Sequence, residues 1–124
     1  MNSYSVPTTK KNPRRIVIHC GTNDVSSGTA PNEVAEEIVD LATNLKSHEN
    51  EVFVSSLVAR GDRWNERVSQ VNNVLKAKCI REGLTFIDNS NIDPAYHLNR
   101  SNLHLNSEGT RMLANNFLRA LGHY

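Results

Sequence analysis

The apolar residues of the chain follow two patterns, short continuous runs and a helical spacing. Three short runs rich in β-branched residues predict strands buried on both faces; they cover residues 16–20, 51–58 and 84–87. Between and after these runs, apolar residues recur every three or four positions, which predicts helices over residues 31–47, 63–82 and 108–121. Strands that alternate with helices predict an α/β fold with a parallel sheet and right-handed crossovers.

The predicted helices have recognisable capping residues at their ends. Thr29 precedes the first helix, Asp62 the second and Ser107 the last. Gly83 and Gly122 are the predicted stops. One face of the last helix is predicted to be apolar and to carry Leu113, Ala114, Phe117, Leu118 and Leu121.

The predicted sheet is incomplete. Three strands are predicted, whereas such sheets usually have about four to six. Two successive right-handed crossovers place the first two helices on one face and leave the last helix alone on the other. We therefore expect a missing edge, as in the carboxyl-terminal part of a larger doubly wound domain. Residues 1–14 show no helical or strand periodicity and are predicted to be a flexible lead-in to a domain over residues 15–124.

Composition limits the partners more than the chemistry. The 124 residues suit one domain, and a content of 38% hydrophobic and 22% charged residues is typical of a soluble globular protein. A formal net charge of +1 favours neither a nucleic-acid nor a membrane partner. No apolar run is long enough for a membrane helix, and no secretory signal is recognisable. Cys20 and Cys79 form no disulfide or zinc pattern, so we expect a cytoplasmic protein without cofactor or metal.

Small and polar residues follow the first predicted strand, at the edge where α/β proteins bind ligands. Gly21 allows a sharp turn or a close approach of substrate, and Asn23 offers an amide donor for an oxyanion. The alternative is a plain strand end, in which Gly21 turns the chain and Asn23 adopts a left-handed conformation. His104, just before the last predicted helix, would lie near the same edge as a candidate general base. An isolated histidine at that position also suits a surface or structural role.

Residues 88–106 form the longest irregular segment, with five Asn, two Asp, two His and one Pro. A loop of this length in a small domain is uncommon unless it is functional or disordered. His97 and His104 could bind a metal together with Asp93. Their spacing is weak support for a metal site, and a surface position is the preferred interpretation of both histidines.

The order of these blocks resembles that of the SGNH/GDSL hydrolase superfamily. Gly-Thr-Asn-Asp is followed by the strand EVFVSSLVAR, then by His-Leu-Asn and the helix SEGTRMLANNFLRAL, so that the resemblance covers nearly all of the chain after residue 14. It implies a three-layer, flavodoxin-like fold that hydrolyses esters with a serine nucleophile, a histidine base and an aspartate that orients the histidine. At the matching positions, it makes Asn23 the oxyanion donor, His104 the base and Gly21 part of the substrate-binding turn.

Two features of that superfamily are missing. Its Gly-Asp-Ser block and its oxyanion glycine belong to the first two strands, and no such block precedes Gly21 in this sequence. Its aspartate lies three residues before the histidine, where this chain has Ser101, a residue that cannot carry the charge that stabilises an imidazolium.

Substitutes for the missing groups can be named from the sequence. Ser55, Ser56 and Cys20 are candidate nucleophiles, although packing roles are the preferred interpretation for all three. Asp88 ends the third predicted strand and Asp93 follows in the long loop, so either could orient the histidine. The sequence does not choose between them.

The resemblance therefore predicts a partial esterase domain: an α/β, three-layer, flavodoxin-like parallel sheet without its first two strands. We expect little or no hydrolysis of a small ester substrate by this chain alone, because triad members act as a unit. The alternative is a non-catalytic binding or assembly module that reuses the fold. Such a module could self-associate through the exposed edge of its first strand.

Overall fold

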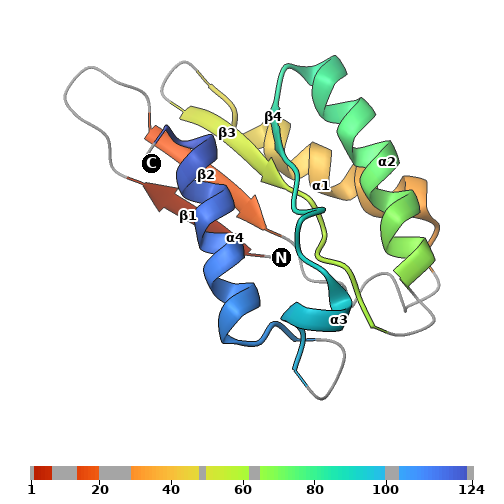
Figure 1. The fold of residues 1–124 in the computed structure, drawn as a ribbon. Helices are drawn as coiled ribbons and strands as arrows, with labels where there is room; N and C mark the ends of the chain where they lie inside the picture. Colours follow the sequence, from red (N-terminus) through yellow and green to blue (C-terminus); the bar gives the residue numbers. More distant parts are fainter. Residues whose placement is uncertain are drawn as a thin grey trace.

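The computed structural model describes residues 2–6, 14–19, 29–47, 50–61, 65–99 and 104–122, the first of these ranges by its backbone only. The elements along the chain are β1 (Asn2–Val6), β2 (Arg14–His19), α1 (Pro31–Leu45), β3 (Asn50–Ser55), α2 (Asn65–Glu82), β4 (Thr85–Ile87), α3 (Pro94–His97) and α4 (Ser107–Ala120). The α/β order predicted from the sequence is confirmed (Figure 1).

The described strands form one sheet in the order β1-β2-β3-β4. β2, β3 and β4 are parallel, as predicted, and the register pairs His19 of β2 with Ser55 of β3. β1 is antiparallel to β2, with Asn2 opposite His19. The prediction of a lead-in without regular structure is wrong for Asn2–Val6, because pairing with the backbone of β2 makes a strand of a segment too short to show a hydrophobic pattern. The edge of β2 that was expected to be exposed is therefore occupied by β1.

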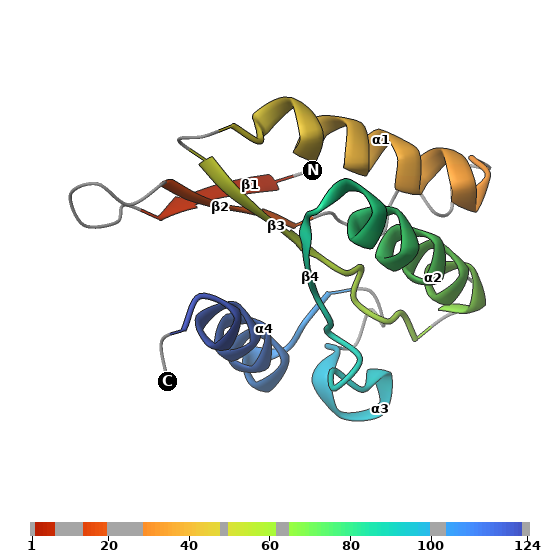
Figure 2. The ribbon, with the colours of Figure 1, turned by 90° about the horizontal axis from the view of Figure 1, so that it is seen from above.

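The helices divide into two layers on opposite faces of the sheet (Figure 2). α1 and α2 cover one face, where Ile18 and Val54 pack with Ile38 and Leu75 in the larger core. α4 covers the other face, and its smaller core consists of Val17, Phe53, Ile87 and Leu121. Neighbouring strand residues point to opposite faces, which is why each strand contributes to both cores. The predicted division of the helices between the two faces is confirmed.

The helix ends differ from the predictions in their capping residues. The N-cap position of α1 is Ala30, one residue after the predicted Thr29, and the helix ends at Leu45. α4 is capped by Asn106, one residue before the predicted Ser107. Gly83 and Gly122 have φ angles of 69° and 82°, left-handed values that suit the predicted helix stops. The predicted cap at residue 62 lies outside the described residues.

The buried face of α4 is rotated slightly from the predicted one. Asn116 is buried, whereas Leu118 is 46% exposed and Ala114 is exposed. Phe117 and Leu121 face the sheet as predicted. A polar residue therefore occupies part of the face that was expected to be wholly apolar.

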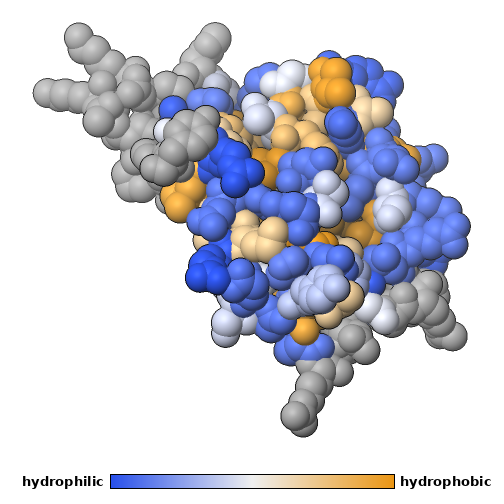
Figure 3. Space-filling model, viewed as in Figure 1, coloured by the Kyte–Doolittle hydropathy of each residue, from blue (hydrophilic) through white to orange (hydrophobic). Residues whose placement is uncertain are grey.

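The described part of the segment after β4 is more regular than the predicted irregular loop, since it contains the short helix α3 and an isolated bridge between Leu98 and Leu105. The face that carries α4 is mostly hydrophilic (Figure 3), with Leu118 and Tyr96 among the exposed large hydrophobic residues of the molecule. None of the described helices is both long and apolar enough to cross a membrane.

Candidate active site

Only some of the predicted site residues belong to the part of the chain that the structure describes. His104 is described, whereas Gly21 and Asn23 lie outside the described residues, as do Cys20 and Ser101. The roles assigned to these four residues therefore stay predictions. β2 ends at His19, so Gly21 and Asn23 follow the carboxyl end of that strand in sequence.

His104 lies in the connection between α3 and α4, and hydrogen bonds hold the described backbone on either side of residues 100–103. The carbonyl oxygen of His104 accepts a hydrogen bond of 2.8 Å from Asn99 N–H. The adjacent Leu105 forms an antiparallel bridge with Leu98, and Asn106 N–H donates to the carbonyl of His97 over 2.9 Å. These contacts tie the histidine segment to the end of α3, with the His104 side chain exposed.

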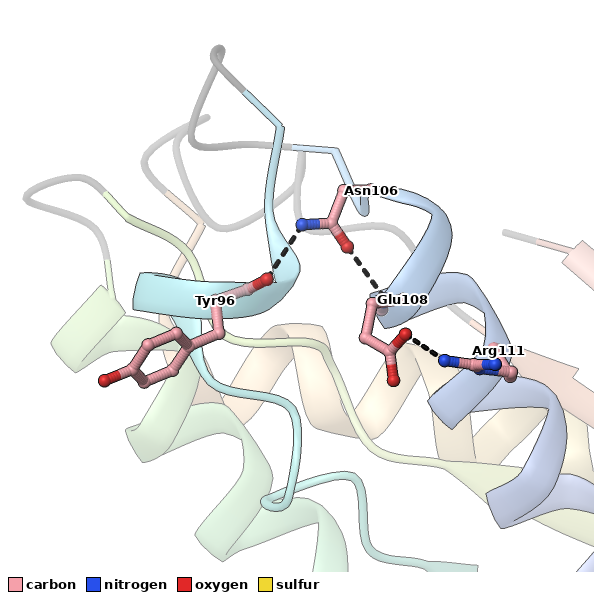
Figure 4. A network of polar contacts seen from close by, with 5 residues as sticks. Tyr96, Asn106, Glu108 and Arg111 are labelled. Atoms are coloured by element: carbon pink, nitrogen blue, oxygen red, sulfur yellow. Dashed lines mark hydrogen bonds and ion pairs between the residues drawn. The ribbon is translucent and has the colours of Figure 1, made fainter.

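Asn106 fixes the start of α4 with its side chain (Figure 4). Its Oδ1 atom accepts from Gly109 N–H over 2.8 Å, which satisfies one free donor of the first helical turn. Its Nδ2 atom donates to the carbonyl of Tyr96 over 2.8 Å. A β-carbon at position 109 would collide with the carbonyl oxygen of His97, so glycine is what allows α4 to approach α3 this closely. An exposed ion pair between Glu108 and Arg111 follows on the same helix.

A row of polar side chains crosses the sheet beneath α4, at the carboxyl ends of the strands. His19 Nδ1 lies 3.1 Å from Ser55 Oγ. Asn89, just after β4, donates from Nδ2 to Ser55 Oγ over 2.7 Å and to the carbonyl of Ser56 over 2.8 Å. Its backbone N–H donates to Ser56 Oγ over 2.9 Å. One asparagine thus joins the ends of β3 and β4, and Ser55 extends the connection to β2.

Asn116 connects this row to α4. Its Nδ2 atom donates to Asn89 Oδ1 over 3.0 Å and to Asn91 Oδ1 over 2.9 Å. Asn91 Nδ2 donates in return to Asn116 Oδ1 over 3.0 Å. Neither Asn89 nor Asn116 was predicted as a site residue. One signal was available, because Leu113, Asn116, Phe117 and Ala120 share the spacing of one helix face.

The environment of His19 favours its neutral form. Burial, and to a lesser degree the positive charge of the amino terminus, lower the pKa of His19 from its ordinary value of 6.5. The ring also contacts Phe117 edge to face, with centroids 5.9 Å apart. Ser55 Oγ accepts a hydrogen bond from Asn89, and its own hydroxyl can donate to His19 Nδ1 at 3.1 Å, a shorter contact than the 3.5 Å to the Ser56 carbonyl.

The serine and aspartate side chains that were named as substitutes for the missing nucleophile and acid are buried or hydrogen-bonded to the backbone. Ser55 is fully buried and Ser56 is 2% exposed, so neither hydroxyl presents a surface to an ester in this conformation. Asp88 accepts from Ser90 N–H over 2.8 Å. Asp93 caps α3 by accepting from Ala95 N–H over 2.8 Å.

The predicted metal alternative gains no geometric support. Asp93 N–H donates to His97 Nδ1 over 2.7 Å, a contact internal to the start of α3. Within the described ranges, no group of three histidine, cysteine, aspartate or glutamate side chains could hold a metal ion.

A cavity of about 500 Å³ opens between α2 and the segment after β4. Asn72 lies in its wall and is held by two hydrogen bonds with Leu57, from Leu57 N–H over 2.8 Å and to the Leu57 carbonyl over 2.9 Å. Lys76, Asp88 and Asp93 also line the cavity. Because Asn89 belongs to both, the cavity adjoins the polar row across the sheet.

Comparisons with known proteins agree with this architecture. The model of the GDSL-like lipase/acylhydrolase family matches residues 5–112. A member of the lipolytic G-D-S-L family from Veillonella parvula has a similar structure, with a TM-score of 0.74, 25% identity, and 94% of this chain and 68% of that chain covered. No curated protein gave a match.

Two other solved structures show the same fold at lower identity. One is a carbohydrate acetylesterase from Sinorhizobium meliloti, with a TM-score of 0.74, 16% identity, and 87% of this chain and 60% of that chain covered. The other is a GDSL-like lipase from Bacteroides thetaiotaomicron, with a TM-score of 0.72, 17% identity, and 86% of this chain and 60% of that chain covered. This chain therefore spans about three fifths of these two proteins. Because the family model covers most of the chain, including Asn23 and His104, the protein belongs to the GDSL-like lipase/acylhydrolase family.

Proposed function

We propose that this acylhydrolase domain supports ester hydrolysis at the carboxyl edge of its sheet. His104 is the proposed general base, Asn23 the proposed oxyanion donor and Gly21 the proposed substrate-binding turn. The observation that carries the proposal is the position of His104, whose backbone is fixed between α3 and the start of α4. A base on a fixed segment loses little conformational entropy when it engages its substrate.

In this reaction a hydroxyl nucleophile adds to the ester carbonyl while His104 takes the hydroxyl proton. The Asn23 amide donates to the carbonyl oxygen as that oxygen gains negative charge. The proton on His104 then passes to the departing alkoxide. Water releases the acyl group in a second addition of the same kind.

The activity expected of this chain alone is low. Residues 1–20 contain no Gly-Asp-Ser block, Ser101 replaces the expected aspartate, and Ser55 is fully buried. The loss of triad members that act as a unit leaves at most the residual rate from binding and from the oxyanion donor.

Two measurements on residues 1–124 test the proposal. Little or no labelling by a fluorophosphonate probe is expected, together with slow hydrolysis of p-nitrophenyl acetate that falls further in His104→Ala. Strong labelling would show that a substitute serine is activated, and the claim of low activity would be wrong. A rate that His104→Ala leaves unchanged would contradict the role of His104. If labelling requires a longer form of the protein, the nucleophile comes from additional sequence.

A non-catalytic assembly module is the second candidate, and the position of β1 favours it. β1 lies at one edge of the described sheet, with β2 as its neighbour. A second copy of the chain could pair along this strand as a partner. Light scattering of the purified chain tests this candidate: a monomer would contradict assembly through β1, whereas an oligomer that forms in a chain without esterase activity would support it.

A further inference from the structure

We propose that Asn89 and Asn116 are positioning residues that hold α4, and with it the His104 segment at its start, in a fixed orientation to the sheet. This inference rests on the proposed function, because His104 is the proposed general base. The two asparagines are not proposed to contact the reacting atoms. They fix the angle at which α4 crosses the sheet.

The contacts form a continuous path between the two elements. Asn116 on α4 donates to Asn89, Asn89 donates to Ser55 on β3, and Ser55 contacts His19 at the end of β2. His19 lies four residues before Asn23 in the sequence. At the other end of α4, Asn106 caps the helix two residues after His104. α4 is thus held at its start by α3 and in its second half by Asn89 and Asn91, just after β4.

Burial explains why hydrogen bonds are used at this position. Asn89 is 2% exposed and Asn116 is 6% exposed. Among the described residues, no buried side-chain nitrogen or oxygen lacks a partner. A fully satisfied buried network favours one arrangement over neighbouring ones, because a shift of the helix would leave polar atoms unpaired. An apolar side chain would fill the same space without fixing an angle, since apolar packing is non-directional.

The geometry makes the His104 segment sensitive to this angle. Asn116 lies ten residues beyond Asn106, so a tilt of about 10° at Asn116 would move the start of α4 by about 2.6 Å. A misplacement of about 1 Å can cost an enzyme about 100-fold in rate. A fixed crossing angle therefore matters more for alignment than for the burial of surface.

The test compares Asn116→Leu with the matched variant Asn115→Leu, since Asn115 is the adjacent and exposed residue on the same helix. Residual dipolar couplings of backbone amides report the orientation of α4 relative to the strands. In Asn116→Leu, the α4 couplings are expected to lose their fit to the alignment found for β2, β3, α1 and α2. The imidazole resonances of His104 are expected to shift at the same time. In Asn115→Leu, both sets should match the unsubstituted protein.

The inference would be overturned if the orientation of α4 and the His104 resonances stay unchanged in Asn116→Leu. The asparagine network would then fill space without setting the orientation of the helix. If Asn116→Leu does not fold, Asn116→Ser serves the same purpose, because it removes the amide with a smaller change. Neither readout requires turnover. A chain without esterase activity therefore leaves the orientation result standing, and an unchanged orientation overturns the inference whatever the esterase assay gives.

Discussion

His19 and Ser55 join the carboxyl ends of β2 and β3 through a partly buried contact of 3.1 Å between Nδ1 and Oγ. The hydroxyl of Ser55 can donate to His19 Nδ1 only while that nitrogen is unprotonated. The stability of the sheet end should therefore depend on pH.

The unfolding free energy is expected to fall as the pH drops from 7 to 5. The pKa of His19 is lowered from 6.5 in the folded protein, so the unfolded chain takes up a proton that the folded chain excludes. This one proton adds a slope of at most about 1.4 kcal/mol per pH unit. Urea unfolding at several pH values gives the unfolding free energy as a function of pH. This free energy should depend less on pH in His19→Gln, which retains the other histidines. An equal pH dependence in the two proteins would contradict a lowered pKa of His19.

Gly109→Ala should destabilise the protein by about 1–3 kcal/mol, because the added methyl group collides with the His97 carbonyl and the Leu105 side chain. Gly122→Ala is the comparison. It has a φ of 82° but open space around the new atom, so strain alone should cost about 1–2 kcal/mol. Only the first substitution should shift the amide resonances of Leu98 and Leu105. Equal spectral effects of the two would argue against the close approach of α4 to α3.

Cys79 should resist alkylation in the folded protein. Its side chain is buried and burial raises the pKa of its thiol to about 11, so little thiolate forms at pH 8. Peptide mapping after iodoacetamide treatment should find residue 79 modified only once denaturant is added. A similar rate of modification with and without denaturant would show that this part of α2 opens easily.

Leu75→Ala and Leu118→Ala should differ in cost. Leu75, on the sheet-facing side of α2, is fully buried, and its truncation should cost about 2–5 kcal/mol of unfolding free energy. Leu118 is 46% exposed, and its truncation should cost about 1 kcal/mol. Thermal or urea unfolding measures both. A larger loss for Leu118 would mean that it is covered in solution by another molecule.

The periodicity of apolar residues was sufficient to predict the three parallel strands and the three long helices. It also predicted how the helices divide between the two faces of the sheet. The runs around Ile18 and Val54 are apolar on both sides, which indicates a sheet covered on both faces. β1 could not be predicted from the sequence, because its stability comes from pairing with β2, which lies beside it only after folding. Asn116 was missed for a related reason, since its partners Asn89 and Asn91 are 27 and 25 residues away.

The candidate site was predicted less completely than the fold. His104 could be named from its place before a helix and from the resemblance, whereas its fixed backbone depends on the bridge between Leu98 and Leu105. The cap of α4 is Asn106 rather than the predicted Ser107. Both residue types can cap a helix, and the contact of Asn106 with α3 determines which of them does.

The unequal size of the two cores has a consequence for cooperativity. Fifteen buried residues form the described core under α1 and α2, while four form the one under α4. Free energies of local opening follow such contacts, so α4 should open more readily than the layer on the other face. Amide hydrogen exchange should then show protection lost first along α4 and last along β3. The histidine segment would belong to a folding unit that detaches from the sheet while the rest of the domain stays intact.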